Sequence, residues 1–446
     1  MTSLPESSLR ALTGRLKEVQ ERFASHYPGE LGNRQPVHTV YGGAHLFKAD
    51  TARKLGELAV KALDQNAPEP RMFAEVIGLA PSLAGMVHGR VRAKLAREAV
   101  EDFRIDFEDG YGIRPDAEED GHAQAAAEET ARGLADGTLS PFIGIRIKTF
   151  SAEMGGRALR TLDLFLTSLV RKSGGKLPPG FVVTLPKVTS PEHVSVLIDA
   201  FEELEKKLGI AGGALKMEPM IETTQSILDE SGESMLPKLL AAARGRCVAA
   251  HFGTYDYTAS CNITAMYQSM RHPACDFAKH MMKVAYAGTG IWLSDGATTV
   301  MPVAPHKAAK GAQLTADQAR ENQRAVHAAW RLHADDVRHS LVNGFYQGWD
   351  LHPAQLPSRY GSVYGFFLEG LQAASERLKN FISKAAQATL VGDVFDDAAT
   401  GQGLLNFFLR GVNCGALTEQ EALATGVTLD ELRGRSFLKI LENRRR

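Results

Sequence analysis

The sequence predicts an α/β protein built on a closed (β/α)8 (TIM) barrel, with a helical extension before the barrel and a helical region after it. Eight apolar runs with the composition of β-strands alternate with helical segments, which is typical of a parallel sheet. An open, doubly wound sheet would produce the same alternation. The count of eight runs, with no GxGxxG motif after any of them, favours the barrel. At 446 residues the chain is long enough for a large barrel with additions.

The predicted strands are the apolar runs themselves, each followed by a polar turn. They cover residues 37–47, 102–110, 142–150, 181–188, 214–223, 247–256, 290–302 and 344–353. Amphipathic patterns at 191–210 and 315–342 predict helices between the strands. The segment 113–139 is acidic and rich in alanine, and it predicts a helix exposed to solvent.

Three parts of the chain differ in their pattern. Residues 1–36 predict an N-terminal helical extension, an amphipathic helix with charges along its length. Residues 37–357 contain the predicted strands and form the catalytic barrel. After Pro357 only helical patterns remain, so residues 358–446 predict a helical C-terminal lid region packed on or over the barrel.

The composition argues against several classes of partner. The chain carries 51 basic and 52 acidic side chains, so long-range electrostatics gives no reason to expect nucleic acid or an anionic membrane. No run reaches about 18 consecutive apolar residues, and the N-terminus lacks the apolar core of a secretion signal. The four cysteines form no CxxC pair, which favours buried free thiols in a reducing compartment. We therefore expect a cytoplasmic protein that acts on a small molecule.

Charged side chains collect where the predicted strands end, which is where (β/α)8 barrels carry their chemistry. They are Glu108, Asp109, Arg146, Lys148, Lys187, Glu222, Asp256, Asp295 and His352. A charge directly after a buried run is costly unless it is paired or binds an ion. Several carboxylates and a guanidinium at one mouth therefore predict a hard divalent cation with a bound anion.

Mg²⁺ suits this set of side chains, because it takes one or two carboxylates, keeps several waters and completes its shell with substrate oxygens. Glu222 and Asp256, on neighbouring strands, suit the role of metal ligands. Glu108 and Asp109 can accept hydrogen bonds from metal-bound waters. Arg146 offers a planar fork of donors to a carboxylate or enolate oxygen. Mn²⁺ is an alternative ion.

The strand ends also form an ordered set of motifs. They read D-x-E-D at 106–109, R-I-K at 146–148, L-P-K-V at 185–188, I-E-T at 221–223, G-x-x-D at 253–256 and L-H-P-x-Q at 351–355. In this order the chain resembles the HpcH/HpaI aldolase and citrate lyase β-subunit family, which includes malyl-CoA lyases. The likeness spans roughly residues 100–355. The family motif on the third strand is R-x-N, so Lys148 is a departure that adds a positive charge and puts the usual substrate in doubt.

The resemblance implies a barrel enzyme in which Glu222 and Asp256 ligate Mg²⁺. It implies that Arg146 binds the substrate oxyanion as a catalytic residue. Glu108 and Asp109 would lie just outside the ligands of the metal.

A further group of residues is expected to contact the substrate. Gly253 has no side chain, so the backbone of Gly253, Thr254 and Tyr255 can approach a ligand closely. The family motif places His352 at the mouth, where Lys148 would add its charge. We expect all of these residues to bind the substrate.

The C-terminal region carries a second likeness. Residues 395–400, followed by Gln402 and an apolar segment, resemble the E-D-A-A-T segment of malate synthases, which share the metal-binding barrel. In those enzymes the aspartate that corresponds to Asp397 is the catalytic acid/base. The alternative is that Asp396 and Asp397 cap the following helix. The two interpretations are compatible, because a capped helix end can present one carboxylate inward.

Together these residues predict a Mg²⁺-dependent carbon–carbon lyase or aldolase that works through an enolate. Its substrate would be a short 2-oxo acid or a 3-hydroxyacyl compound, free or as a CoA thioester, and a homo-oligomer is compatible with the resemblance. Arg146 would stabilise the developing charge, and Asp397, on a helical lid, would move the proton. The alternatives are a Schiff base on Lys148 or Lys187, His45 as the base, an acyl-CoA thioesterase, and a catalytically silent binding barrel.

Overall fold

The computed structural model contains a closed barrel of eight parallel strands in chain order, in which β8 pairs with β1. The structure describes residues 3–29, 32–308, 313–383, 389–391, 394–396, 398–434 and 440. The barrel strands are β1 (His38–Gly43), β2 (Asp102–Asp106), β3 (Phe142–Arg146), β4 (Val182–Leu185), β5 (Lys216–Ile221), β6 (Ala249–Phe252), β7 (Trp292–Ala297) and β8 (Gln347–Asp350). Each strand lies within one of the eight predicted runs, so the predicted fold class is confirmed.

Helices connect the strands and continue beyond the barrel. They are α1 (Glu6–His26), α2 (Thr51–Asn66), α3 (Pro70–Ile77), α4 (Ala84–Glu98), α5 (Asp116–Asp136), α6 (Gly155–Lys172), α7 (Pro191–Leu208), α8 (Leu236–Ala242), α9 (Thr254–Ser260), α10 (Pro273–Tyr286), α11 (Ala316–Val342), α12 (Leu356–Ser383), α13 (Ala398–Asn413), α14 (Glu419–Leu423) and α15 (Leu429–Gly434). A separate antiparallel pair joins β9 (Thr389–Val391) and β10 (Val394–Asp396). The sequence sets some ends directly: α7 begins at Pro191 and ends where Gly209 adopts a φ of 69°.

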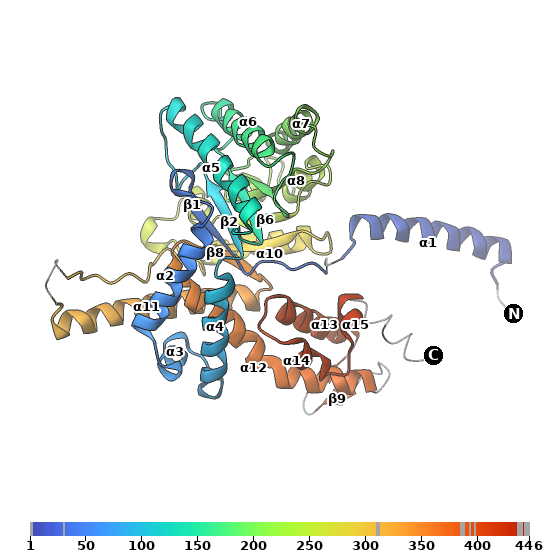
Figure 1. The fold of residues 1–446 in the computed structure, drawn as a ribbon. Helices are drawn as coiled ribbons and strands as arrows, with labels where there is room; N and C mark the ends of the chain where they lie inside the picture. The colour runs from blue at the N-terminus through green and yellow to red at the C-terminus, as the bar shows by residue number, and fades with distance from the viewer. Residues whose placement is uncertain are drawn as a thin grey trace.

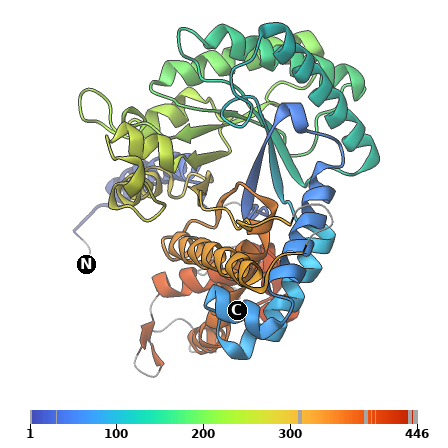
Figure 2. The ribbon, with the colours of Figure 1, turned by 90° about the vertical axis from the view of Figure 1, so that its left-hand side faces the viewer.

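Two groups of helices lie on opposite sides of the barrel (Figures 1 and 2). Helices α5, α6, α7 and α8 cover the side drawn at the top of Figure 1. Helices α2, α3 and α4 all precede β2, and they pack with α11 and α12 on the other side. Helix α13 packs against α12 and extends this second group. In the part of the chain that the structure describes, no helix combines the length and apolar composition that crossing a membrane requires.

Helices are present in both predicted flanking regions, but the C-terminal one, which was expected to contain helices only, also contains the strand pair β9 and β10. Helix α1 lies within the predicted N-terminal extension, and none of its residues is buried. Helix α12 begins at Leu356, so the predicted boundary after residue 357 falls in its first turn. Because α12 follows β8 and packs against α11 and α4 as well as α13, it joins the barrel to the C-terminal helices. The division of the chain into domains stays a prediction.

Helix α5 forms in the segment expected to be an exposed helix, but one face of it is buried. The residues of this face are Glu119, Ala123, Ala126, Ala127, Thr130, Ala131 and Gly133. The expectation of an exposed helix is therefore wrong for this face. The physical reason is that small alanine side chains let α5 pack closely against α6.

The barrel interior contains a buried polar layer, which we call the interior layer. Its members are Thr39, Asp102, Arg104, Thr184, Glu218, His251 and Gln347, each at most 3% exposed. The interiors of such barrels are more often filled by branched apolar side chains. Here apolar side chains such as Ile105, Ile145 and Val183 alternate with the polar ones and pack outward in the hydrophobic core.

Candidate active site

The interior layer is held together by charge-assisted hydrogen bonds. Arg104 donates through Nε and Nη2 to the two carboxylate oxygens of Glu218, at 2.8 and 2.9 Å, and through Nη1 to Asp102. Asp102 accepts a hydrogen bond of 2.8 Å from Thr39. His251 Nε2 lies 3.2 Å from Glu218 Oε2. Burial alone would raise the pKa of Glu218, but Arg104 and His251 outweigh it and hold this pKa well below its usual range.

Glu222 occupies the mouth end of the same strand in a different environment. It directly follows β5, is 1% exposed, and accepts a hydrogen bond of 2.7 Å from the backbone N–H of Lys187. Burial raises the pKa of Glu222 to about 8, and although Lys187 acts in the opposite direction, the Asp256 carboxylate adds to the rise. A Cβ on Gly253 would lie 2.5 Å from Glu222 Cβ, so only glycine at position 253 leaves room for this side chain.

Lys187 connects the carboxylates of the mouth. Its ammonium contacts Glu108, lies 3.4 Å from Asp109 Oδ1 and lies 3.6 Å from Asp256 Oδ2. Asp256 lies in α9, after β6, and its side chain is 42% exposed, so this carboxylate borders solvent. Lys187 has a φ of 50°, in the left-handed region that residues with a side chain rarely adopt. The structure therefore brings together the predicted metal ligands and the two acidic residues expected behind them.

Arg146 is fixed by a residue to which no role was assigned from the sequence. Its Nε and Nη2 donate to the two carboxylate oxygens of Asp106 at 2.7 and 2.5 Å. Its remaining nitrogen, Nη1, lies 3.2 Å from Glu108 Oε2 and 3.4 Å from Asp109 Oδ2. The guanidinium lies over the ring of Tyr41, 4.8 Å from the centroid. Asp106 thus holds two of the three guanidinium nitrogens, and the third, Nη1, faces the mouth carboxylates.

Asp106 also shapes the loop that carries two of these carboxylates. Its Oδ1 accepts from the backbone N–H of Glu108 at 2.9 Å, and its Oδ2 accepts from that of Gly110 at 2.7 Å. The alternation along β2 could have indicated its inward direction, because Asp106 shares the parity of Asp102 and Arg104. Burial raises the pKa of Glu108 to about 7, although the Arg146 guanidinium acts in the opposite direction.

The predicted substrate-binding lysine lies beneath this loop. Lys148 is 5% exposed, and its Nζ donates to the carbonyl oxygens of Phe107 and Gly112 at 2.5 and 3.1 Å. The same nitrogen lies 3.0 Å from Glu119 Oε2. These three acceptors match the three protons of an ammonium. The structure therefore places Lys148 as a support of the loop, and its contact with a substrate stays a prediction.

The other predicted substrate-binding side chains make contacts of their own. Thr254 donates to Met270 Sδ at 3.2 Å, and the Tyr255 hydroxyl lies 3.1 Å from that of Thr299. His352 Nδ1 accepts from the backbone N–H of Ala354 at 3.1 Å and caps a short 3-10 turn. Burial lowers the pKa of the His352 imidazole.

Three further candidates make other contacts or lie outside the described residues. Asp295 is buried and pairs with Lys279 at 3.1 Å. Burial lowers the pKa of His45, whose ring lies 5.6 Å from that of Tyr111. Asp397, the predicted acid/base, lies outside the described residues. Among the described residues, no group of three or more His, Cys, Asp and Glu side chains is arranged to hold a metal ion.

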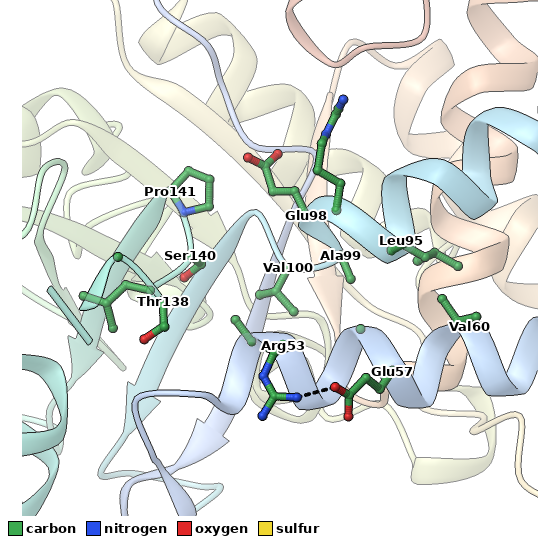
Figure 3. A pocket seen from close by; sticks show the side chains of 16 residues that line it. Arg53, Glu57, Val60, Leu95, Glu98, Ala99, Val100, Thr138, Ser140 and Pro141 are labelled. Atoms are coloured by element: carbon green, nitrogen blue, oxygen red, sulfur yellow. Dashed lines mark hydrogen bonds and ion pairs between the residues drawn. The ribbon is translucent and has the colours of Figure 1, made fainter. Parts of the chain in front are cut away.

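A groove of about 700 Å³ lies away from this mouth (Figure 3). Its lining includes the ion pair of Arg53 and Glu57 on α2 and the apolar side chain of Leu95 on α4. Residues 98–100 and 137–141 complete it, directly before β2 and β3. The groove therefore lies at the amino ends of these strands, where barrels of this type do not carry their chemistry.

Comparison with known proteins agrees with the barrel. The model of DUF6986, a domain of unknown function, matches residues 16–440. A citrate lyase from Burkholderia xenovorans LB400 shares 18% identity, with 88% of this chain and 96% of that chain covered and a TM-score of 0.55. This likeness shows the fold.

Other comparisons are more distant. Haloferax volcanii malate synthase in its lead(II) complex shares 14% identity, with 93% and 98% of the two chains covered and a TM-score of 0.45. Its magnesium/glyoxylate complex shares 15% identity, with 90% and 97% covered and a TM-score of 0.44. No curated protein sequence matches the chain. The finer resemblance to HpcH/HpaI aldolases stays a prediction.

Proposed function

The chain belongs to the DUF6986 family, and we propose that it is a divalent-metal-dependent enzyme that forms or cleaves a carbon–carbon bond. The proposed reaction passes through the enolate of a short 2-oxo acid or 3-hydroxyacyl substrate, free or as a CoA thioester. The observation that carries the proposal is Glu222, a buried mouth carboxylate whose pKa burial raises to about 8. The fold shared with a citrate lyase and the ordered strand-end motifs support it.

The donor set of the mouth fits Mg²⁺ or Mn²⁺. A buried carboxylate gains most from a cation, and Glu222 is buried with Asp256 near enough to raise its pKa. Mg²⁺ takes one or two carboxylates and fills its remaining positions with waters and substrate oxygens, so two protein ligands are sufficient. We assign Glu222 and Asp256 as these ligands. When bound, the ion would supply Lewis-acid polarisation of a substrate oxygen.

The chain's own residues would orient the substrate and balance its charge. Arg146 is held rigid by Asp106, so its Nη1 is a preorganised donor for a carboxylate or enolate oxygen. Lys187 keeps Glu108 and Asp109 together, and these carboxylates can accept hydrogen bonds from waters at the mouth. We also propose, from the sequence motifs, that five further residues contact the substrate. They are Gly253, Thr254, Tyr255, Lys148 and His352.

The proton-transfer step is assigned from the sequence likeness. Asp397 is our candidate for the group that moves a proton at the nucleophilic carbon, and His45 is the alternative. A Schiff-base route is less well supported. Burial would lower the pKa of Lys187, but Glu222 and Glu108 outweigh it and raise this pKa above its ordinary value, which keeps the amine protonated.

The test measures metal binding first and turnover second. Mn²⁺ binding to EDTA-treated protein is followed by titration calorimetry, and 2-oxo acids are then combined with aldehydes or acyl-CoAs in the presence of Mg²⁺. We expect Glu222→Gln to weaken metal binding and to lower activity by on the order of 100-fold. The exposed Glu230→Gln is the matched control, and it should change neither.

Several outcomes would contradict the proposal. Activity that survives EDTA would exclude the metal role, and equal Mn²⁺ binding by Glu222→Gln would exclude this ligand. Free thiol without a carbon–carbon product would indicate a thioesterase. Tight substrate binding without turnover, with the metal bound, would indicate a silent binding protein.

A further inference from the structure

Helix α1 stands apart from the rest of the chain. It has 21 residues, and none of them is buried. Figure 1 shows it leading away from the barrel and the helices around it. Beyond its carboxyl end, the backbone N–H of Gly29 donates to the carbonyl of Gly288, between α10 and β7, at 2.7 Å. The base of α1 is therefore held on the body, while the helix itself projects.

One face of α1 carries apolar side chains along its length. Leu9, Leu12, Leu16, Val19 and Phe23 are 44%, 44%, 63%, 48% and 59% exposed. Their spacing alternates between three and four residues, which is the a and d pattern of a coiled coil. A single helix of this length gains little stability in water without a packed face. The residues that flank the stripe are polar, and they are Thr13, Arg15, Gln20 and Arg22. A helix that packs on a globular body carries a wider apolar face, so this narrow stripe points to another helix as the partner.

We propose that α1 pairs with α1 of a second copy of this chain as a parallel, in-register coiled coil. A parallel register places each apolar residue of the stripe beside the same residue of the second copy, so the stripe is complementary to itself. The anchor at Gly288 argues against the body of the same chain as the partner, because it fixes the end from which α1 leads away.

The charges that flank the stripe favour the parallel orientation. Arg15 and Arg22 occupy g positions, and Gln20 occupies an e position within the helix. In the parallel arrangement a g residue faces the following e residue of the other helix, so Arg15 meets Gln20, while the helix ends at His26 before Arg22 reaches an e residue. In an antiparallel arrangement g faces g, which would bring Arg15 against Arg22 twice. Like charges at these positions are destabilising.

The first test is the mass of the full chain in solution, measured by light scattering at concentrations up to about 100 μM. We expect at least a dimer, and we expect Leu16→Glu to reduce the mass to that of a monomer. Glu21→Lys is the matched control, because position 21 lies on the opposite face and its charge change is also large. Since α1 buries no residue, neither variant should alter the melting temperature of the body. A monomeric wild type, or an oligomer that Leu16→Glu leaves intact, would overturn the proposal.

The second readout is the register of the pair. With Cys261, which is partly exposed, changed to serine, the remaining cysteines are buried. Mild oxidation should then link two copies of Leu9→Cys to each other, because a residue at one end of the stripe meets its own counterpart only in the parallel register. Glu21→Cys should stay unlinked. A link between Leu9→Cys and Phe23→Cys, without self-linkage of Leu9→Cys, would indicate an antiparallel pair and contradict the proposal.

Discussion

Two buried glutamates, one in strand β5 and one directly after it, lie under opposite electrostatic conditions. Glu218 and Glu222 are four residues apart, and each is 1% exposed. The guanidinium of Arg104 bonds both oxygens of Glu218 and holds its pKa well below the usual range against the effect of burial. Burial raises the pKa of Glu222 to about 8. Equal burial thus has opposite results, and the difference is whether the protein itself supplies the neutralising cation.

The cations of the mouth are shared among more carboxylates than they can neutralise. Arg146 commits two of its nitrogens to Asp106. Lys187 contacts Glu108 and lies 3.6 Å from Asp256.

In the interior layer Arg104 contacts both carboxylates, and although burial still raises the pKa of Asp102, the pKa of Glu218 is held low. At the mouth, no cation among the described residues holds the pKa of Glu222 down in this way, so the mouth would gain stability from one more positive charge. This contrast in charge supports the proposal that the mouth, and not the interior layer, binds a cation.

The largest expected effect comes from removing the arginine of the interior layer. In Arg104→Met, Asp102 and Glu218 stay buried without the cation that both contact. Breaking a buried pair in this way costs about 3–5 kcal/mol, so the free energy of unfolding measured with urea should fall by that amount. Arg160→Met removes an exposed arginine that pairs with Asp120, and it should leave stability nearly unchanged. A small effect of Arg104→Met would mean that the layer does not depend on this cation.

The second prediction concerns the mouth. Here removing a charged side chain should stabilise the metal-free protein, whereas Arg104→Met should destabilise it. The folded-state pKa of Glu222, about 8, lies above its ordinary value of 4.5, so the folded state holds the proton more tightly than the unfolded state. Without metal, this group's contribution to stability is complete below about pH 4.5 and is lost as the pH rises to about 8. Glu222→Gln removes this dependence.

The measurement is urea unfolding of both proteins in EDTA at about pH 5 and about pH 8. Each unit of pKa shift corresponds to about 1.4 kcal/mol. Between these two pH values, the free energy of unfolding of Glu222→Gln should therefore rise by about 2–4 kcal/mol relative to that of the wild type. Saturating Mg²⁺ should remove the gain, because a bound cation stabilises the charged carboxylate. Parallel pH profiles of the two proteins would show that Glu222 is ionised in the metal-free fold.

The sequence predicted the strands and the strand-end carboxylates well, for a simple physical reason. Parallel strands buried on both faces leave a continuous apolar run, and the first charge after the run marks the mouth. Glu222 and Asp256 were found in this way, and the structure places both at the mouth with Lys187. Arg104 was not found, because it lies inside a run and only the charges at the ends of the runs were considered, although its parity with Asp102 and Asp106 marks a shared face.

Lys148 illustrates a second difficulty. It has the same parity as Arg146, so the alternation of a strand would direct both side chains into the mouth. However, β3 ends at Arg146, and beyond that residue the pleat no longer sets the direction. The Lys148 side chain instead reaches Glu119 on α5, whose buried face the sequence did not reveal. Long-range partners of this kind depend on helix packing, which one sequence does not specify.

The smallest expected effect on stability comes from the second proposed ligand. The Asp256 side chain is 42% exposed, so its charge is already solvated and Asp256→Asn should change the free energy of unfolding by less than about 0.5 kcal/mol. Mg²⁺ stabilises a protein only through its binding to the folded state. We therefore expect Mg²⁺ to raise the melting temperature of the wild type but to raise that of Asp256→Asn much less. The exposed Glu230→Gln should respond as the wild type does. If Asp256→Asn also kept the full response to Mg²⁺, the cation would not need the Asp256 carboxylate. The proposed pair of ligands, Glu222 and Asp256, would then be wrong.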